Sequence, residues 1–301
     1  MKKSLSCSTA SIYSFSAKHQ PMLEVEAGTQ VVLETYDCFT NQITSSDTPF
    51  NSIDWQQINP ATGPVFVKEA QPGDILKVTI DEIELADQGV MATGPGLGVM
   101  GDEINTFTTK MISIQNGKAV FDEDLQIPLN PMIGVIGVAP EEGDIPCGAP
   151  GPHGGNMDNK MITKGATLYF PVFVEGALFA LGDLHAAMGD GEIGVSGVEI
   201  PGKVTVTLDV IKGQSIAYPF LENDDVVTSI VSKETLDEAV KGSVKEMANR
   251  LQPKFGLSVE DLTMLLSAVG QTQICQVVDP LMTARFVVPK WVLQAKKVTL
   301  F

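Results

Sequence analysis

The sequence predicts a mainly β protein, an antiparallel sandwich or barrel, joined to a smaller α+β unit that carries a pair of helices late in the chain. Three observations support this fold class. Several short segments alternate apolar and polar residues, as half-buried strands do. Pro-Gly, Asn-Gly and Gly-Asp turn sequences separate them, and no strand-helix-strand period repeats before residue 230. Apolar residues at helical spacing begin only beyond Pro219.

The alternating segments predict the strands in order. Residues 31–38 are rich in β-branched side chains, and the alternation places Asp37 on the same face as apolar residues. In residues 75–85 the apolar parity changes after Ile80, as a β-bulge would cause. Residues 203–210 give the clearest half-buried strand, because every even position from 204 to 210 is apolar. Such strands form sheets with one solvated face.

Capping residues predict two helices after these strands. The first has Ser232 as its expected N-cap and ends near Pro253. The second is capped by Ser258, with an acidic residue three positions later, as in a capping box. Two apolar segments between residues 274 and 289 then return to sheet. The expected units are residues 1–215 and 216–301, and interleaved units are the alternative, because no low-complexity linker divides the chain.

Composition excludes several classes of function. The chain has 37 acidic and 20 basic residues, and a net charge of -17 would repel nucleic acid. No apolar stretch has the length of a membrane span, and no signal-peptide segment follows the first lysines, so we expect a cytoplasmic protein without a membrane role. The four cysteines form no Cys-x-x-Cys pair, which fits free thiols in a reducing compartment.

Two of the three histidines lie in segments rich in glycine and acidic residues. In residues 177–185, a period of two places Asp183 and His185 on one face of a buried strand, where both could reach one cation. A buried histidine that hydrogen-bonds the aspartate for packing explains the spacing equally well. Small and glycine residues follow the strand and could bring Asp190 or Glu192 back toward the same place.

The second histidine lies in a long loop of turn-forming residues. His153, Asn156 and Asp158 offer further metal ligands or hydrogen bonds to a substrate, while a cluster of surface turns is the alternative. Two rival signals are weaker. The glycine-rich segment 94–101 has no helix after it and is a turn, not a dinucleotide site. Cys38 or Cys147 could be a nucleophile, but neither lies in a recognisable motif.

At these residues the sequence resembles the acetamidase/formamidase family. The resemblance extends over nearly the whole chain and is carried mainly by Gly-Asp183-Leu-His185-Ala-Ala-Met-Gly-Asp-Gly-Glu192 and Gly-Pro-His153-Gly-Gly-Asn-Met-Asp158. It implies a jelly-roll-like sandwich with a smaller α+β part, a homo-oligomer of two or more chains, and hydrolysis of a short aliphatic amide to a carboxylate and ammonia. It also implies metal ligation by Asp183 and His185, with Asp37 and His153 reaching the same site, and places Glu142 or Glu192 near the scissile bond.

The chemistry expected of such a site agrees with these residues. A divalent ion, with zinc expected first and calcium or another ion as the alternative, activates water and polarises the amide oxygen. Glu142, with Glu192 second, would transfer the proton to the departing nitrogen. Backbone N–H groups of Gly154 and Gly155 would bind the oxyanion, and Asn156 and Asp158 would contact the amide. A thiol-dependent amidase and a non-catalytic jelly-roll module that binds a small ligand or metal are the alternative functions.

Overall fold

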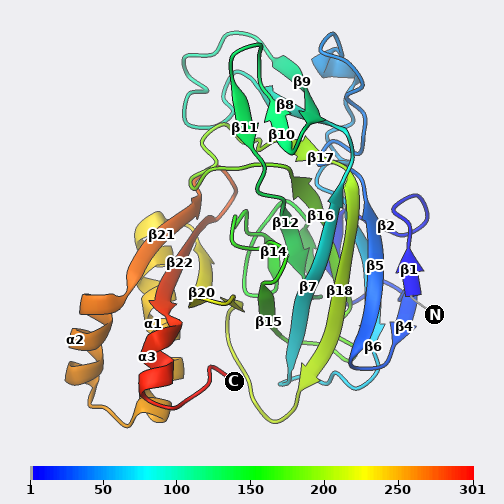
Figure 1. Cartoon of the computed structure of the whole chain (residues 1–301). Coiled ribbons are helices and arrows are strands. Elements are labelled where there is room, and N and C mark those ends of the chain that lie inside the picture. Colours follow the sequence, from blue (N-terminus) through cyan, green and yellow to red (C-terminus); the bar gives the residue numbers. More distant parts are fainter. Residues whose placement is uncertain (1–2) are drawn as a thin grey trace.

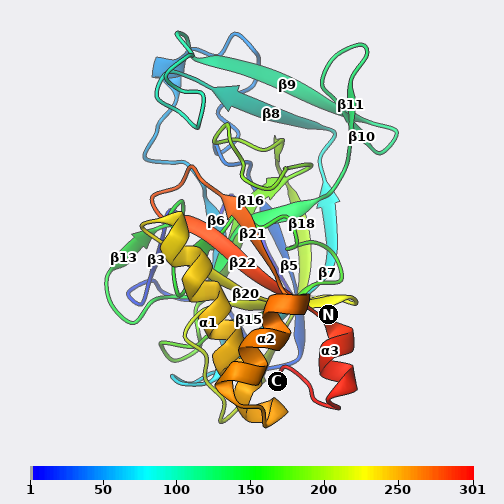
Figure 2. The same cartoon turned by 90° about the vertical axis from the view of Figure 1, so that its left-hand side faces the viewer.

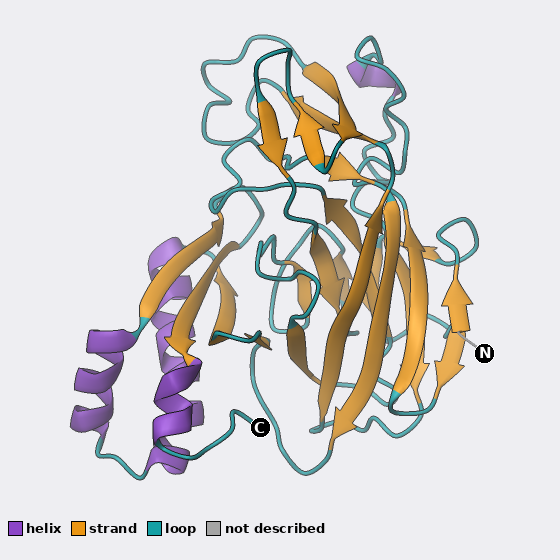
Figure 3. Cartoon of the chain, in the orientation of Figure 1, coloured by secondary structure: helices purple, strands orange, loops and turns teal. Residues whose placement is uncertain are grey.

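The computed structural model describes residues 3–301, with residue 50 described by its backbone alone, and confirms a mainly β fold with antiparallel sheets and C-terminal helices (Figures 1 and 3). Two large sheets account for most strands. A third pairing joins Ser14–Ser16 (β3) to Asp144–Pro146 (β13). A short 3-10 turn covers Phe50–Ser52 (η1).

The first sheet contains nine strands, and all neighbouring pairs are antiparallel except the first. In spatial order they are Lys3–Leu5 (β1), Thr29–Thr35 (β5), Gly202–Ile211 (β18), Ile75–Leu85 (β7), Thr167–Pro171 (β15), Phe220–Glu222 (β19), Val226–Lys233 (β20), Met282–Pro289 (β22) and Gln271–Gln276 (β21). The sheet is therefore continuous across the expected boundary at residue 215, because β19 pairs with β15.

The second sheet has a main path of eight strands and carries the site described below. Its path is Gln126–Pro128 (β11), Lys118–Val120 (β10), Thr108–Gln115 (β9), Gln88–Thr93 (β8), Glu199–Ile200 (β17), Phe179–His185 (β16), Met132–Gly137 (β12) and Gly154–Asn156 (β14). Ala61–Val67 (β6) pairs with β16, and both Ser11–Ile12 (β2) and Leu23–Val25 (β4) pair with β6. The strands β8–β11 rise above the sandwich in Figure 1.

The main hydrophobic core lies between the two sheets. Val204 and Leu208 of β18 belong to the same buried cluster as Ile133 of β12 and Leu184 of β16. A second buried cluster joins β20 and β22 to the helices and includes Met247. Burial of these apolar side chains is the main contribution to the stability of the fold, at about 25 cal/mol per Å² of apolar surface removed from water.

Two of the predicted strands are confirmed closely, and the third ends earlier than predicted. The strand β7 covers residues 75–85, and its pairing with β18 skips one residue just after Ile80, which is the predicted bulge. The even-numbered residues Val204, Val206 and Leu208 of β18 are buried, as their alternation predicts. The strand β5 ends at Thr35, so Asp37 lies beyond it, although Asp37 is buried as expected.

The helical pair is also present, with one correction at its start. The first helix, Leu236–Phe255 (α1), has Thr235 and not Ser232 as its N-cap, because Ser232 pairs with Thr283 in the sheet. Its end also passes beyond Pro253 to a left-handed glycine. The second helix, Val259–Val269 (α2), has the predicted Ser258 cap. Lys290–Ala295 (α3) follows β22.

Helices α1 and α2 cover one face of the strands β20–β22 (Figure 2). The helix α1 contacts both β20 and β22, and α2 contacts β22. Among residues 3–301, no helix combines the length and the apolar character needed to cross a membrane.

Candidate active site

His185 lies at the end of β16, in the interior of the second sheet. At this point β16 pairs with β12 and β17, so His185 is opposite Met132 and Glu199. The alternation along β16 turns Asp183 toward the same side, and Asp183 Oδ1 lies 3.5 Å from His185 Nε2. The predicted convergence of the two side chains is therefore confirmed.

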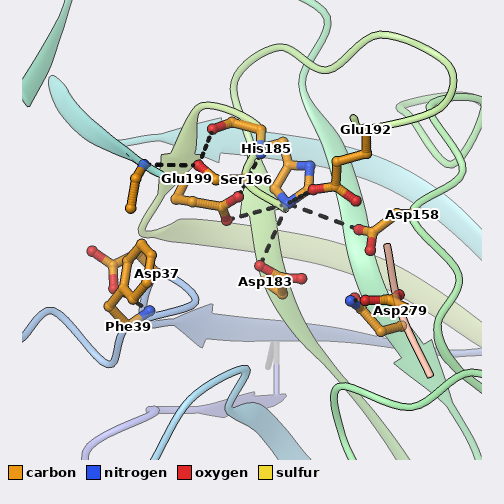
Figure 4. Close-up of polar contacts among 12 residues, drawn as sticks. Asp37, Phe39, Asp158, Asp183, His185, Glu192, Ser196, Glu199 and Asp279 are labelled. Atoms are coloured by element: carbon orange, nitrogen blue, oxygen red, sulfur yellow. Dashed lines mark hydrogen bonds and ion pairs between the residues drawn. The ribbon is translucent and has the colours of Figure 1, made fainter. Parts of the chain in front are cut away.

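Four buried carboxylates surround this imidazole, and Figure 4 shows them pointing toward Nε2 from different directions. Besides Asp183, the distances from Nε2 are 3.2 Å to Glu199 Oε2, 3.9 Å to Asp158 Oδ1 and 4.0 Å to Glu192 Oε1. The four acids come from β16, β17, the segment after β14 and the loop after β16. The fold thus gathers acidic residues that are distant in the sequence into one buried group, which we call the acid cluster.

The backbone is strained at three of these four acids. The φ angles are +41° at Asp158, +55° at Asp183 and +41° at Glu192. Residues other than glycine rarely adopt such angles, and each costs on the order of 1–3 kcal/mol. Strain of this kind persists where the surrounding structure imposes it, and it is concentrated at functional sites. The strained backbone at these three acids thus lowers local stability, while it brings their side chains together.

Glycines leave room for the acid cluster. A Cβ atom on Gly134 of β12 would lie 2.5 Å from Asp158 Oδ1 and 2.6 Å from Asp183 Oδ2. A Cβ atom on Gly197 would lie 2.7 Å from His185 Nδ1. Both positions therefore require glycine, because a methyl group would displace the carboxylates or the imidazole.

Burial perturbs the protonation of Asp158, Glu192, Glu199 and His185. Desolvation raises the pKa of Asp158 to about 6 and that of Glu199 to about 8. Burial and the nearby Asp158 raise the pKa of Glu192 well above its ordinary value. Burial would lower the pKa of His185, but Glu199 and Asp183 hold it well above the usual range. Strong perturbation of several adjacent groups is typical of functional sites.

The acid cluster also has donor atoms suited to a cation. Asp158 Oδ1, Asp183 Oδ1 and Glu199 Oε2 are buried and accept no hydrogen bond in the described structure. No lysine or arginine of residues 3–301 forms an ion pair with the four acids. Two sets of donors each lie within 4.8 Å of one another, namely Cys38, Asp183 and Glu199, and Asp158, His185 and Glu192. Carboxylate, imidazole and thiolate together suit a divalent ion such as zinc.

Asp37 lies beside the acid cluster in Figure 4 but uses one carboxylate oxygen locally. Its Oδ1 accepts hydrogen bonds from the backbone N–H groups of Phe39 and Asn41, at 3.0 and 2.7 Å. Burial raises the pKa of Asp37 to about 6, with a further contribution from the charge of Asp183. Asp37 belongs to neither set of clustered donors, so its ligand role stays a prediction.

His153 is buried away from the described ion pairs of His185. Its ring packs edge-on against Phe15, with 5.1 Å between ring centroids, and neither ring nitrogen has a hydrogen-bond partner. Burial lowers the pKa of His153 to about 4, so the imidazole is neutral near pH 7. His153 is in neither donor set. As for Asp37, the ligand role of His153 therefore stays a prediction.

The other expected contacts are divided between the interior and the surface. Asn156 is buried, and its Nδ2 donates to Asp279 Oδ2 at 3.1 Å. Gly154 and Gly155 adopt φ angles of +98° and +77°, and any Cβ there would lie 2.3 Å from a backbone oxygen. Glu142, the favoured base in the sequence, is instead exposed in the turn before β13. Of the two candidate glutamates, only Glu192 lies in the acid cluster.

Two acidic residues of the site gave no sequence signal. Glu199 follows a valine and precedes an isoleucine in a two-residue strand too short to show a pattern, and its partner His185 is 14 positions away. Asp279 comes from the turn between β21 and β22, and burial with the nearby Asp158 raises its pKa well above the ordinary value. Only the folding of distant segments brings them together.

A buried arginine fixes the surroundings of the acid cluster. Arg285 of β22 donates to Asn159 Oδ1 at 2.8 Å and to Asp190 Oδ2 at 2.7 Å. Asn159 adjoins Asp158, and Asp190 lies two residues before Glu192. The C-terminal unit thus orients two of the loops that supply acids.

Thiol chemistry is disfavoured by the surroundings of the two candidate cysteines. Burial and the charges of Glu199, Asp183 and Asp37 raise the pKa of Cys38 well above its ordinary value. Burial also raises the pKa of Cys147. The thiolate is the nucleophilic form, so both groups are poor nucleophiles near neutral pH.

Two cavities border the acid cluster. The first, which we call the aromatic cavity, has a volume of about 580 Å³ and includes Cys38, Ser196 and Asp279 in its wall. The second, which we call the loop cleft, has a volume of about 610 Å³ and includes Glu192 and Ser196. Ser196 lies in both walls, while Glu192 is the member of the acid cluster that lines the loop cleft.

The chain resembles known proteins along most of its length. It matches the model of the acetamidase/formamidase family over residues 15–144 and 144–294. A formamidase of Methylophilus methylotrophus is 27% identical over 257 residues, and the match spans 64% of this chain and 62% of that relative.

Solved structures agree more closely. A recombinant predicted acetamidase/formamidase of Thermoanaerobacter tengcongensis is 51% identical, with a TM-score of 0.97 and coverage of 99% of both chains. An acetamidase of Bacillus halodurans is 45% identical, with a TM-score of 0.96, and the match covers 98% of this chain and 100% of that one.

Proposed function

Because the chain belongs to the acetamidase/formamidase family, we propose that it hydrolyses short aliphatic amides to a carboxylate and ammonia with the help of a divalent ion. The observation that carries the proposal is the buried His185 with four carboxylates around its Nε2 atom, three of which direct toward it an oxygen that accepts no hydrogen bond. Buried carboxylates lose the solvation of their charge, and a divalent cation between them would compensate for that loss.

His185, Asp183 and Glu199 would hold the ion, because the carboxylate oxygens of Asp183 and Glu199 are the two nearest to His185 Nε2. Cys38 adjoins the two acids and would favour zinc over a harder ion. When bound, a divalent ion polarises the amide carbonyl and lowers the pKa of water toward 7. Neutral Asn156, whose Oδ1 has no hydrogen-bond partner, would accept a hydrogen bond from the amide.

Glu192 is the proposed proton carrier. It would accept the proton of the attacking water and deliver it to the departing nitrogen, because ammonia is a poor leaving group unless protonated. Two observations favour it over Glu142. Its carboxylate lies in the acid cluster, and it also lines the loop cleft, where solvent water can reach it. A cytoplasmic homo-oligomer completes the proposal, supported by four buried free cysteines for the compartment and by the family resemblance for the assembly.

Metal removal tests the proposal directly. We expect chelation followed by gel filtration to abolish ammonia release from acetamide and formamide, and stoichiometric zinc to restore it. The melting temperature should also fall, since an ion that binds only the folded state at 100 times its Kd stabilises by about 2.7 kcal/mol. Chelator-insensitive turnover that iodoacetamide abolishes would instead support the thiol-dependent amidase. Inactivity of the metal-replete protein on a broad amide panel would support the binding module.

The Gly134→Ala substitution tests the arrangement of the acid cluster. The added methyl group would overlap Asp158 and Asp183, so we expect these carboxylates to move apart and the site to lose at least tenfold in metal affinity. An effect of 10–100-fold is usual when residues that orient ligands are replaced. Titration with a fluorescent zinc competitor measures this affinity. Gly189→Ala is the matched control, because its Cβ atom would meet nothing within 4 Å.

A further inference from the structure

The aromatic cavity is much larger than a short amide. Its volume of about 580 Å³ would hold roughly 19 water molecules at about 30 Å³ each. Acetamide has only four non-hydrogen atoms, so it would leave most of this space to water. Cavities of this size usually hold ligands of drug-like dimensions and bury most of their surface.

Four aromatic side chains contribute to the wall of this cavity. Tyr13, Phe39, Trp55 and Phe107 all line it. The ring of Trp55 packs edge-to-face against both Phe39 and Phe107, with centroids 6.5 and 6.1 Å apart. Edge-to-face rings hold one another in fixed positions and offer further edges and faces to a ligand ring. The wall is therefore pre-organised for a flat apolar group.

The charge of the wall restricts this group further. Among the described lining residues, Asp279 is the single charged side chain, and it lies at the end of the cavity that meets the acid cluster. No lysine or arginine is present there to bind an anionic substituent. An anionic substituent would therefore find no counter-charge among the lining residues, which favours a neutral group.

The position of Glu192 decides which side of the amide bond enters this cavity. Under the proposed function, the leaving nitrogen must receive its proton from Glu192, which lines the loop cleft and not the aromatic cavity. The nitrogen then lies on the side of the loop cleft. The acyl substituent, on the other side of the carbonyl carbon, extends toward the aromatic rings.

We propose that this chain also hydrolyses primary amides whose acyl group carries a neutral aromatic ring, with the ring bound between Trp55 and its neighbours in the aromatic cavity. This inference rests on the proposed function and extends its range of substrates. The reaction is the same: water adds to the carbonyl carbon, the C–N bond breaks, and the products are an arylalkanoate and ammonium.

The first test compares substrates on the metal-replete wild-type protein. We expect the KM for phenylacetamide to be at least tenfold below that for acetamide, with ammonia released from both. We also expect N-benzylacetamide, which places the ring on the nitrogen, to react at least tenfold more slowly than phenylacetamide in kcat/KM. Hydrolysis of acetamide without a lower KM for phenylacetamide would overturn the inference and leave the proposed function intact. Inactivity on every amide would overturn both.

The second test removes part of the wall. Trp55→Ala should lower the ratio of kcat/KM for phenylacetamide to that for acetamide at least tenfold. Trp291 is the other tryptophan of the chain, is 57% exposed on α3, and provides the matched control Trp291→Ala, which should not change the ratio. An unchanged ratio in a folded Trp55→Ala protein would overturn the inference. If that variant does not fold, the wild-type comparison still decides.

Discussion

His185→Ala is expected to lose the bound metal and to lower kcat/KM for acetamide by about 10³-fold or more, since several kcal/mol of transition-state stabilisation depend on the ion and each 1.36 kcal/mol is a factor of ten. The physical reason is that Nε2 lies within 4.0 Å of an oxygen of each of four buried acids. Without the imidazole, the nitrogen ligand that lies between these carboxylates is lost. Elemental analysis after gel filtration measures the metal, and ammonia release measures activity.

His153→Ala is the matched comparison for this variant. From the sequence we expected both histidines at the ion. In the structure the His153 ring packs against Phe15 and belongs to neither donor set. We therefore expect His153→Ala to keep stoichiometric metal, although removal of a buried ring costs stability. If His185→Ala retained its metal and His153→Ala lost it, the choice of the acid cluster as the metal site would be wrong.

The sequence predicted the part of the site that depends on local periodicity. Asp183 and His185 are two residues apart on one strand, so alternation alone places them on the same face. Glu199 could not be predicted in this way, because it meets His185 only through the pairing of β16 with β17. Asp279 enters from a turn between two strands of the other sheet. The pairing of strands that are distant in the chain produces no regular spacing of residues, so a single sequence does not reveal it.

The same distinction holds for the fold. The bulge in β7 and the cap at Ser258 are local features that the sequence specifies, and both are present. The prediction of Ser232 as the N-cap was wrong. Both Ser232 and Thr235 carry a hydroxyl that can cap a helix, so local chemistry does not distinguish them. The pairing of β20 with β22 does, because it holds Ser232 in the sheet. Local chemistry identified the kind of element, while tertiary pairing fixed its first residue.

Glu192→Gln is expected to lower kcat by about 10²–10⁴-fold, the usual contribution of a positioned acid or base. The amide has nearly the shape of the carboxylate and can still contact Asp158, but it cannot accept the proton of water at neutral pH. Bound metal should remain, because His185 Nε2 lies nearer to Glu199 Oε2 and Asp183 Oδ1 than to Glu192 Oε1. Retained metal with lost turnover would thus separate proton transfer from metal binding.

Glu142→Gln provides the comparison, since the sequence favoured that glutamate and the structure exposes it. We expect its kcat to stay within a few-fold of the wild type, because an exposed carboxylate outside the acid cluster has no contact with a buried water. The reverse result, a large loss in Glu142→Gln and none in Glu192→Gln, would restore the sequence-based choice of base. Loss of metal from Glu192→Gln would instead show that Glu192 is a ligand. The glutamine has nearly the same shape and leaves the other donors in place, so the loss could be attributed to the missing carboxylate.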